Sequence, residues 1–203
     1  QIWLAILVYF CHQITIYTVI FFLPSIIGKY GSLSLMSVGL LTSLPWIVAA
    51  LGAISLPRLA TSAQRARRLL VCGLLTMAAG LLIAAFSGPV FSLLGFCVAA
   101  LMFFVVQSII FLYPASRLKG AALAGGLGFV NSCGLLGGFV GPSVMGAIEM
   151  STGDAMNGLK AIALVLLVAA LAALRLRQGQ EDPRPVRPMA AVAHPVSGRS
   201  NAL

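Results

Sequence analysis

Two long tracts without a charged side chain limit what this sequence can fold into more than any other feature. No Asp, Glu, Lys or Arg occurs from Tyr30 to Pro57, and none occurs from Leu69 to Ser116. A helix crosses the hydrocarbon of a bilayer with about 20 apolar residues, so each tract is long enough to span a membrane. Only 8% of the residues are charged and 60% are hydrophobic, whereas a soluble domain usually carries about 25% charged residues. The sequence therefore predicts an integral membrane protein.

The positive net charge does not indicate a nucleic-acid-binding protein. The 13 basic residues outnumber the 4 acidic ones, but they lie in short gaps between apolar runs and in the C-terminal tail. Nucleic-acid binding would need them on one face of a soluble core. In membrane proteins this distribution decides which side of the bilayer each loop occupies. We expect the lipid bilayer, and no nucleic acid, to be the partner.

Nothing in the sequence indicates a metal site, a cofactor or an enzyme. Four cysteines lie inside apolar runs, without CxxC spacing or a His cluster: Cys11, Cys72, Cys97 and Cys133. No phosphate-binding loop or dinucleotide fingerprint occurs in a suitable context. An intramembrane serine protease would need a His beside its nucleophile. Ser143 is the nearest candidate nucleophile and His12 is the only histidine in an apolar run, so we expect no enzyme.

The apolar runs can be counted as membrane spans. The predicted spans cover residues 3–27, 35–56, 69–86, 90–113, 121–148 and 161–174. Pro24 and Pro114 are expected to end the first and the fourth span, and Ser87-Gly88-Pro89 is expected to separate the third from the fourth. The sixth span is the shortest, but basic residues flank it and can extend it by snorkelling. Residues 1–175 are therefore predicted to form a six-span transmembrane unit.

The loop charges predict how these spans are oriented. Residues 58–68, residues 117–119 and the chain beyond Leu174 together hold 11 of the 13 Lys and Arg residues. These segments share one side of the membrane, and the positive-inside rule makes it the cytoplasmic side. We expect a multi-pass protein of the cell inner membrane with both ends cytoplasmic. Residues 176–203 contain four prolines and are expected to form a disordered basic tail.

The first three spans and the last three resemble each other. The sequences FFLP at 21–24 and FLYP at 111–114 lie 90 residues apart. Two glycine pairs share a spacing of 13 residues: Gly39 with Gly52, and Gly128 with Gly141. In that alignment Thr42 stands opposite Asn131. Two three-helix units of opposite orientation are typical of secondary transporters, and the sequence therefore indicates two inverted three-helix repeats.

Two segments carry a resemblance to a known family. Ser37–Pro45 resembles the eighth helix of major facilitator superfamily carriers. Residues 128–142, GFVNSCGLLGGFVGP, are similar to the eleventh helix of its anion:cation symporter family, which includes carriers for hexuronates, tartrate and phthalate. The resemblance covers residues 1–175 and implies an all-α fold, the C-terminal six-helix half of a twelve-helix permease. It also implies a small organic anion, a coupling proton or cation and an N-terminal six-helix half as partners.

The loop after the second span departs from this family. In the superfamily the corresponding loop usually carries a Gly and an acidic residue before its Arg pair. Residues 56–68 read LPRLATSAQRARR, with the arginines but with neither the Gly nor the acid. A gating ion pair that depends on this acid is therefore not expected here.

Four polar side chains within the spans are the candidates for substrate binding. Gln13 and Tyr17 lie four residues apart in the first span and so share a helix face, while Gln107 lies in the fourth span and Asn131 in the fifth. Asn131 matches the Asn of the family motif. Hydrogen bonds between helices are the alternative role for all four. His12 can titrate near neutral pH and so could couple a proton, but we expect it to be a packing or interface residue. An amide flanked by aromatic residues, as Gln107 is by Phe103 and Phe111, suits a sugar-acid or aromatic-acid site, but we expect these two aromatic residues to face lipid.

The fifth span also carries a strip of small residues. Gly134 and Gly138, and Gly137 and Gly141, are each four residues apart, which favours close helix packing. Pro142 after Gly141 adds a point at which the helix can flex. We expect packing first and flexing as a second role.

Two absences complete the prediction. No predicted span contains an interior Lys, Arg, Asp or Glu, although an anion symporter needs a cation for its substrate and usually a carboxylate for its proton. The chain also begins without Met or a basic signal-peptide start. We expect a fragment of a secondary active transporter that works by alternating access, whose anion-binding Arg and proton carrier lie in the other half. The alternative is a complete six-span oligomeric channel or assembly protein.

Overall fold

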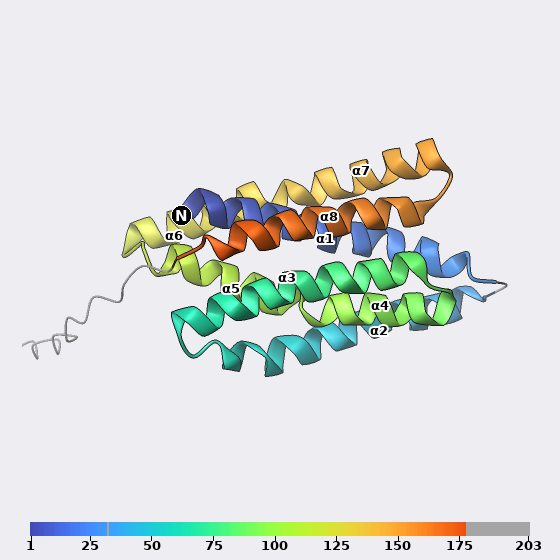
Figure 1. The fold of residues 1–203 in the computed structure, drawn as a ribbon, viewed down its shortest axis with the longest axis horizontal. Helices are drawn as coiled ribbons and strands as arrows, with labels where there is room; N and C mark the ends of the chain where they lie inside the picture. The colour runs from blue at the N-terminus through green and yellow to red at the C-terminus, as the bar shows by residue number, and fades with distance from the viewer. Residues whose placement is uncertain (32, 178–203) are drawn as a thin grey trace, which may run out of the picture.

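The protein is a bundle of α-helices, seen here in a computed structural model that describes residues 1–31 and 33–177 (Figure 1). Helices and one 3-10 turn make up the secondary structure of these residues: α1 Ile2–Gly28, α2 Leu35–Ser55, η1 Pro57–Leu59, α3 Ala63–Phe86, α4 Pro89–Leu101, α5 Phe103–Ala115, α6 Ala121–Leu135, α7 Gly137–Thr152 and α8 Ala155–Leu174. The predicted tail, apart from residues 176 and 177, lies outside the described residues.

Six segments of the described chain are long and apolar enough to cross a membrane, as predicted. Two of them are not single helices. The fourth span is interrupted at Met102, between α4 and α5, and the fifth is interrupted at Leu136, between α6 and α7. The prediction that Pro24 ends the first span was wrong, because α1 continues past it to Gly28, whereas α5 ends one residue after Pro114. Neighbouring helices can satisfy the backbone groups that such a proline frees.

Two spans begin earlier than predicted because side chains cap them. Ser62 accepts a hydrogen bond from the backbone N–H of Arg65, so α3 includes the basic residues that were assigned to a loop. The Asp154 carboxylate accepts one from Met156, so the sixth span has 20 residues and is not short. Beyond its other end, Leu176 is fully buried.

The two predicted three-helix units interlock. The unit of α1 to α3 packs on the unit of α4 to α8 through reciprocal pairs: α1 lies against α7, α2 against α4, and α3 against α8. A Cβ atom at Gly52 of α2 would collide with the carbonyl oxygen of Leu101, and one at Gly141 of α7 would collide with that of Ile14. Gly39 and Gly128, the first members of the two pairs, each face open space. Aligned glycines thus occupy equivalent places.

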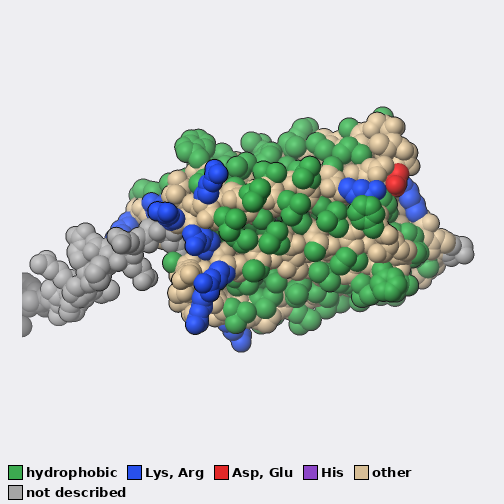
Figure 2. Space-filling view, in the orientation of Figure 1, with side chains coloured by type: hydrophobic (Ala, Val, Ile, Leu, Met, Phe, Trp, Pro, Cys, Tyr) green, Lys and Arg blue, Asp and Glu red, His purple; other side chains and the backbone are tan. Residues whose placement is uncertain are grey.

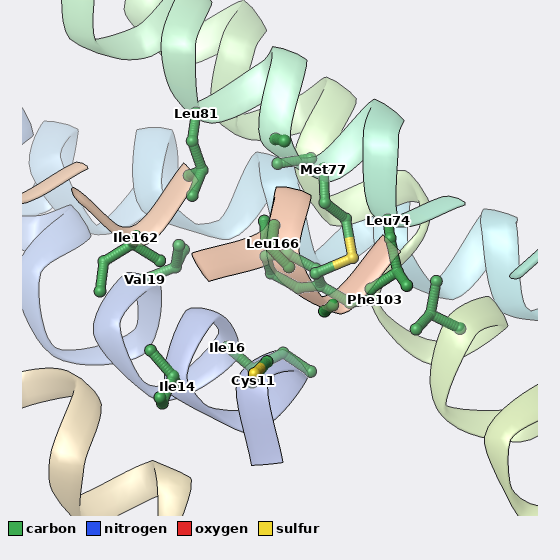
Figure 3. Packing of buried hydrophobic residues seen from close by; sticks show 14 of the residues in the cluster. Cys11, Ile14, Ile16, Val19, Leu74, Met77, Leu81, Phe103, Ile162 and Leu166 are labelled. Carbon is green, nitrogen blue, oxygen red and sulfur yellow. The ribbon is translucent and has the colours of Figure 1, made fainter. Parts of the chain in front are cut away.

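The best-covered part of the bundle lies where α1, α3, α5 and α8 meet. Figure 3 shows side chains of these helices that belong to one buried cluster, among them Val19, Met77, Phe103 and Leu166. These four side chains are at most 1% exposed. Lipid tails are as apolar as these residues, so close packing rather than exclusion of water holds such helices together.

The two ends of the bundle differ in charge. Lys and Arg side chains gather at the end that carries the N-terminus (Figure 2). We call this the basic end; it consists of residues 57–68, 116–120 and 175–177 and contains no Asp or Glu. At the opposite end Lys29 forms an ion pair of 2.7 Å with Glu149. The difference is the one that the sequence predicts, while the side of the membrane on which each end lies stays a prediction.

Candidate functional site

All four predicted binding residues line one pocket of about 330 Å³ between α1, α2, α5 and α6. Its polar lining consists of Tyr9, Gln13, Tyr17, Gln107 and Asn131, and its apolar lining of Ile16, Ile20, Trp46, Phe104 and Leu135. Residues as far apart in the sequence as Tyr9 and Leu135 meet here. The pocket contains amide and phenol groups and no Asp, Glu, Lys or Arg.

A chain of hydrogen bonds joins three of the polar residues. The Tyr9 hydroxyl donates to Asn131 Oδ1 at 3.0 Å, and Gln107 Nε2 donates to the same hydroxyl at a longer 3.4 Å. The Tyr9 hydroxyl thus bonds to two amide side chains, that of Gln107 in α5 and that of Asn131 in α6. Residues held by such bonds present a fixed set of donors and acceptors to anything that enters the pocket.

Helical periodicity explains why α1 contributes three of these side chains. Tyr9, Gln13 and Tyr17 follow one another at intervals of four, which places them on one face of the helix. Helix α2 contributes Trp46, and α5, which begins at Phe103 after the interruption at Met102, contributes Phe104 and Gln107. Gln107 lies one turn into α5, while Asn131 lies one turn before the interruption at Leu136. The pocket is therefore built beside both interrupted spans.

The glycine strip brings α6 and α7 onto α1. Gly134 lies against the ring of Tyr9, and Gly138 lies against the ring of Tyr17, where a Cβ atom would approach ring carbons at 2.7–2.9 Å. Gly137 instead lies against the backbone carbonyl of Phe10. Two of the predicted packing residues, Gly134 and Gly138, thus lie against side chains that line the pocket. The flexing of the helix at Gly141 and Pro142 stays a prediction.

His12 is not among the residues that line the pocket, although its ring centroid lies 6.0 Å from that of Tyr9. It is fully buried, and its Nε2 lies 2.8 Å from the carbonyl oxygen of Phe103. Because a carbonyl only accepts, Nε2 carries the proton. The Ser143 hydroxyl donates to Phe139 of its own helix. The described residues thus contain no Ser–His pair of the kind that a serine protease needs, and no group of three metal-ligating side chains.

Sequence reasoning missed six of the ten lining residues: Tyr9, Ile16, Ile20, Trp46, Phe104 and Leu135. Tyr9 was not considered, although it lies four residues before Gln13 and so on the predicted face. Trp46 and Phe104 carried no such signal, because an aromatic residue in a span usually packs or faces lipid. The expectation that Phe103 faces lipid was wrong: it is fully buried, and its ring centroid lies 6.0 Å from that of Trp46.

The fold and the site together define a multi-pass membrane protein built of two interlocked three-helix units around a polar pocket. The family model of the Major Facilitator Superfamily matches residues 4–201. The chain belongs to this family, as the resemblance of its second and fifth spans indicated.

Curated relatives agree with this assignment. The chain is 30% identical to the Inner membrane transport protein RhmT of Escherichia coli (strain K12) over 87% of its own length. It is 31% identical to a Quinolone resistance transporter of Acinetobacter baumannii over 82%, and 33% identical to a "Putative tartrate transporter" of Agrobacterium vitis over 93%. These matches cover 42%, 39% and 41% of the relatives, so the chain spans about two fifths of their length.

Proposed function

We propose that this chain forms one half of a secondary active transporter that moves a small organic anion across the cell membrane by alternating access. The pocket that holds Gln13, Tyr17, Gln107 and Asn131 together carries this proposal. Amides and phenols can donate to a carboxylate and can also accept from a hydroxyl, which is the combination that a hydroxy acid such as tartrate requires. A relative whose printed name includes tartrate supports this substrate class.

The proposal assigns the countercharge to another part of the protein. The pocket has no cationic side chain, and a carboxylate that leaves water needs one. The two least covered spans support a second helical unit as its source. Within their most apolar windows, 17% of the residues are buried in Leu35–Leu59 and 22% in Ala121–Thr152. Both spans contribute to the pocket, so a unit that packs on them would close it.

Uptake by the full native polypeptide tests the proposal. Cells that lack their own carriers would express the protein and take up a radiolabelled panel of tartrate, hexuronates and phthalate. We expect saturable uptake of at least one acid, with the apparent KM raised about tenfold by Asn131→Ala through loss of its hydrogen bonds. Thr42→Ala, at the aligned position outside the pocket, is the matched control. Normal uptake by Asn131→Ala contradicts the assigned site.

Coupling to a proton or another cation is a separate part of the proposal. No ionisable carboxylate lies in the pocket, so we assign the proton carrier to the second half. Uptake into proteoliposomes should rise when an inward proton or sodium gradient is imposed, and a protonophore should abolish the proton-driven part. Uptake that depends on neither gradient argues for facilitated diffusion instead.

The size of the native polypeptide separates this proposal from a six-span oligomer. A mass about twice the 21.2 kDa of this chain supports a two-half carrier. A native protein of 21.2 kDa that functions as an oligomer would support the channel or assembly protein. We also propose that both ends of the chain are cytoplasmic, because the basic end carries eight Lys and Arg residues.

A second candidate function rests on the aromatic lining of the pocket. Trp46 and Phe104 form one wall, and an aromatic wall suits a planar aromatic acid. The match to a Quinolone resistance transporter points to the same class of compound. Expression that raises the inhibitory concentration of a quinolone, with Trp46→Leu reversing the effect, would favour export of an aromatic acid over uptake of a hydroxy acid.

A further inference from the structure

A second pocket, away from the candidate transport site, lies at the basic end and combines arginines with a mostly apolar lining. It has a volume of about 440 Å³ and is lined by residues of η1, of the loop that follows and of the first turns of α3: Arg58, Leu59, Thr61, Arg65, Arg68, Leu69 and Cys72. We propose that this pocket binds an anionic phospholipid, with the three guanidinium groups around the headgroup phosphate and the acyl chains along Leu69 and Cys72.

The arginines around this pocket lack a carboxylate partner. Residues 30–148 contain no Asp or Glu, and the one ion pair among the described residues lies at the opposite end of the bundle. Arg65 donates to the Thr61 hydroxyl at 2.8 Å, which orients its guanidinium beside the pocket. Three cations held together without a countercharge favour binding of an anion. The N-terminus of α3 adds partial positive charge at the same place.

The position of the pocket along the membrane normal favours a lipid over a free anion as its ligand. Helix α3 has 24 residues and is about 36 Å long, some 6 Å more than the hydrocarbon of a bilayer. Its first turn, with Arg65, therefore lies at the level of the headgroups. Leu69 and Cys72 follow at intervals that keep them on the same helix face, one and two turns deeper, and Cys72 is exposed. Polar and apolar parts thus match a headgroup and its chains.

Basic pockets between membrane helices are a recognised form of site for acidic phospholipids. Arg58 belongs to η1 and Arg65 to α3, so a phosphate between them would connect the ends of α2 and α3. The chain also offers a matched control. Arg67 belongs to the same turn of α3 but faces a different surface, where it lines a pocket with Gln64 and Leu176.

Native mass spectrometry of the full polypeptide, released from detergent with added lipid, tests this inference. Phosphatidylglycerol and phosphatidylcholine with identical chains are the probes. We expect the wild-type protein to bind phosphatidylglycerol about tenfold more tightly, and the triple variant Arg58→Gln/Arg65→Gln/Arg68→Gln to lose about tenfold or more of that affinity. Arg67→Gln should stay within about twofold of the wild type. If the wild-type protein binds the two lipids equally tightly, the proposal is overturned, whatever the variants show.

Two further arms locate the ligand. The rate at which a thiol reagent alkylates Cys72 can be measured by peptide mapping. Bound phosphatidylglycerol should slow this reaction, whereas phosphatidylcholine should not. Inorganic phosphate at the same concentration should leave the lipid bound; displacement of the lipid would assign the pocket to a free anion and overturn the proposal. An equal loss of affinity in Arg67→Gln would also overturn it, because it would reduce the effect to the general charge of this end.

Discussion

The two three-helix repeats share their packing and differ in their polar residues. Gly52 in the first repeat and Gly141 in the second are both buried against the backbone of a helix from the other repeat. Gly39 and Gly128, each 13 residues earlier, both face open space. Equivalent positions therefore make equivalent contacts, and the frame of the bundle is built twice.

The polar positions do not follow this symmetry. Asn131 accepts a hydrogen bond from Tyr9 across the helix interface. Thr42, its aligned counterpart, donates only within its own helix, to the carbonyl oxygens of Val38 and Gly39 at 2.9 Å. The hydrogen bond that Asn131 forms across the helix interface therefore has no counterpart at Thr42. The buried glycines, which occur in both repeats, hold the bundle together. The polar residues that meet at Asn131 are the candidates for contact with a ligand.

The largest effect should come from breaking the shared frame. A valine at Gly52 or at Gly141 would collide with a backbone carbonyl that cannot move aside, and we expect each change to cost about 3 kcal/mol or more of folding stability. Gly39→Ala and Gly128→Ala are the matched controls, since each new methyl group meets open space. Thermal unfolding of the purified protein and its yield as a single species measure both pairs.

Comparing the two aligned pairs of glycines tests whether the repeats are equivalent. If the repeats are equivalent, the two valine variants lose similar stability, while the two alanine variants keep or slightly raise it because Ala favours a helix over Gly. A valine tolerated at one buried position and not at the other would show that the symmetry of the frame is only apparent.

The second prediction separates packing from binding inside the second repeat. Gly137 faces the backbone of Phe10, whereas Gly138 faces the ring of Tyr17, which can rotate away. We expect Gly137→Ala to lower stability by about 1–3 kcal/mol. Gly138→Ala should cost less stability but weaken substrate binding, because the displaced ring lines the pocket. Unfolding temperature and ligand affinity, measured on both variants, should rank them in opposite orders. The same order in both measurements would contradict this separation.

The sequence predicts the frame of the bundle better than it predicts the contacts within the pocket. The number of spans and the pairing of the glycines depend on apolar run length and on spacing, which the sequence displays directly. The interruptions at Met102 and Leu136 are not displayed in this way, because neither residue is a helix breaker. Gln13, Tyr17, Gln107 and Asn131 were predicted because an amide or hydroxyl is conspicuous in a span. Tyr9 shares the helix face of Gln13 and could have been included on that ground, but the hydrogen bond from its hydroxyl to Asn131 of α6 follows only from the packing of the helices.

The third prediction concerns that hydroxyl. Tyr9→Phe keeps the ring against Gly134 and Phe111 but removes the group that bonds to Asn131 and Gln107. We expect the fold to be retained and ligand affinity to fall about three- to tenfold, the effect of one hydrogen bond. Thr42→Val removes a hydroxyl from the aligned interface and should leave affinity unchanged. Equal losses in the two variants would mean that polar residues of both repeats face the ligand.

The smallest effect should come from the ion pair between the repeats. Lys29 follows α1 and reaches Glu149 near the end of α7 at 2.7 Å, with side-chain exposures of 56% and 27%. Such an exposed pair contributes about 1 kcal/mol or less. Lys119 lies 90 residues later, at the aligned place in the second repeat, and forms no ion pair among the described residues. We expect Lys29→Gln to lower the unfolding temperature slightly at low salt and Lys119→Gln to leave it unchanged. At about 1 M salt, where charges are screened within about 3 Å, the two variants should no longer differ. A difference that persists at high salt would assign the effect of Lys29 to packing of its side chain rather than to its charge.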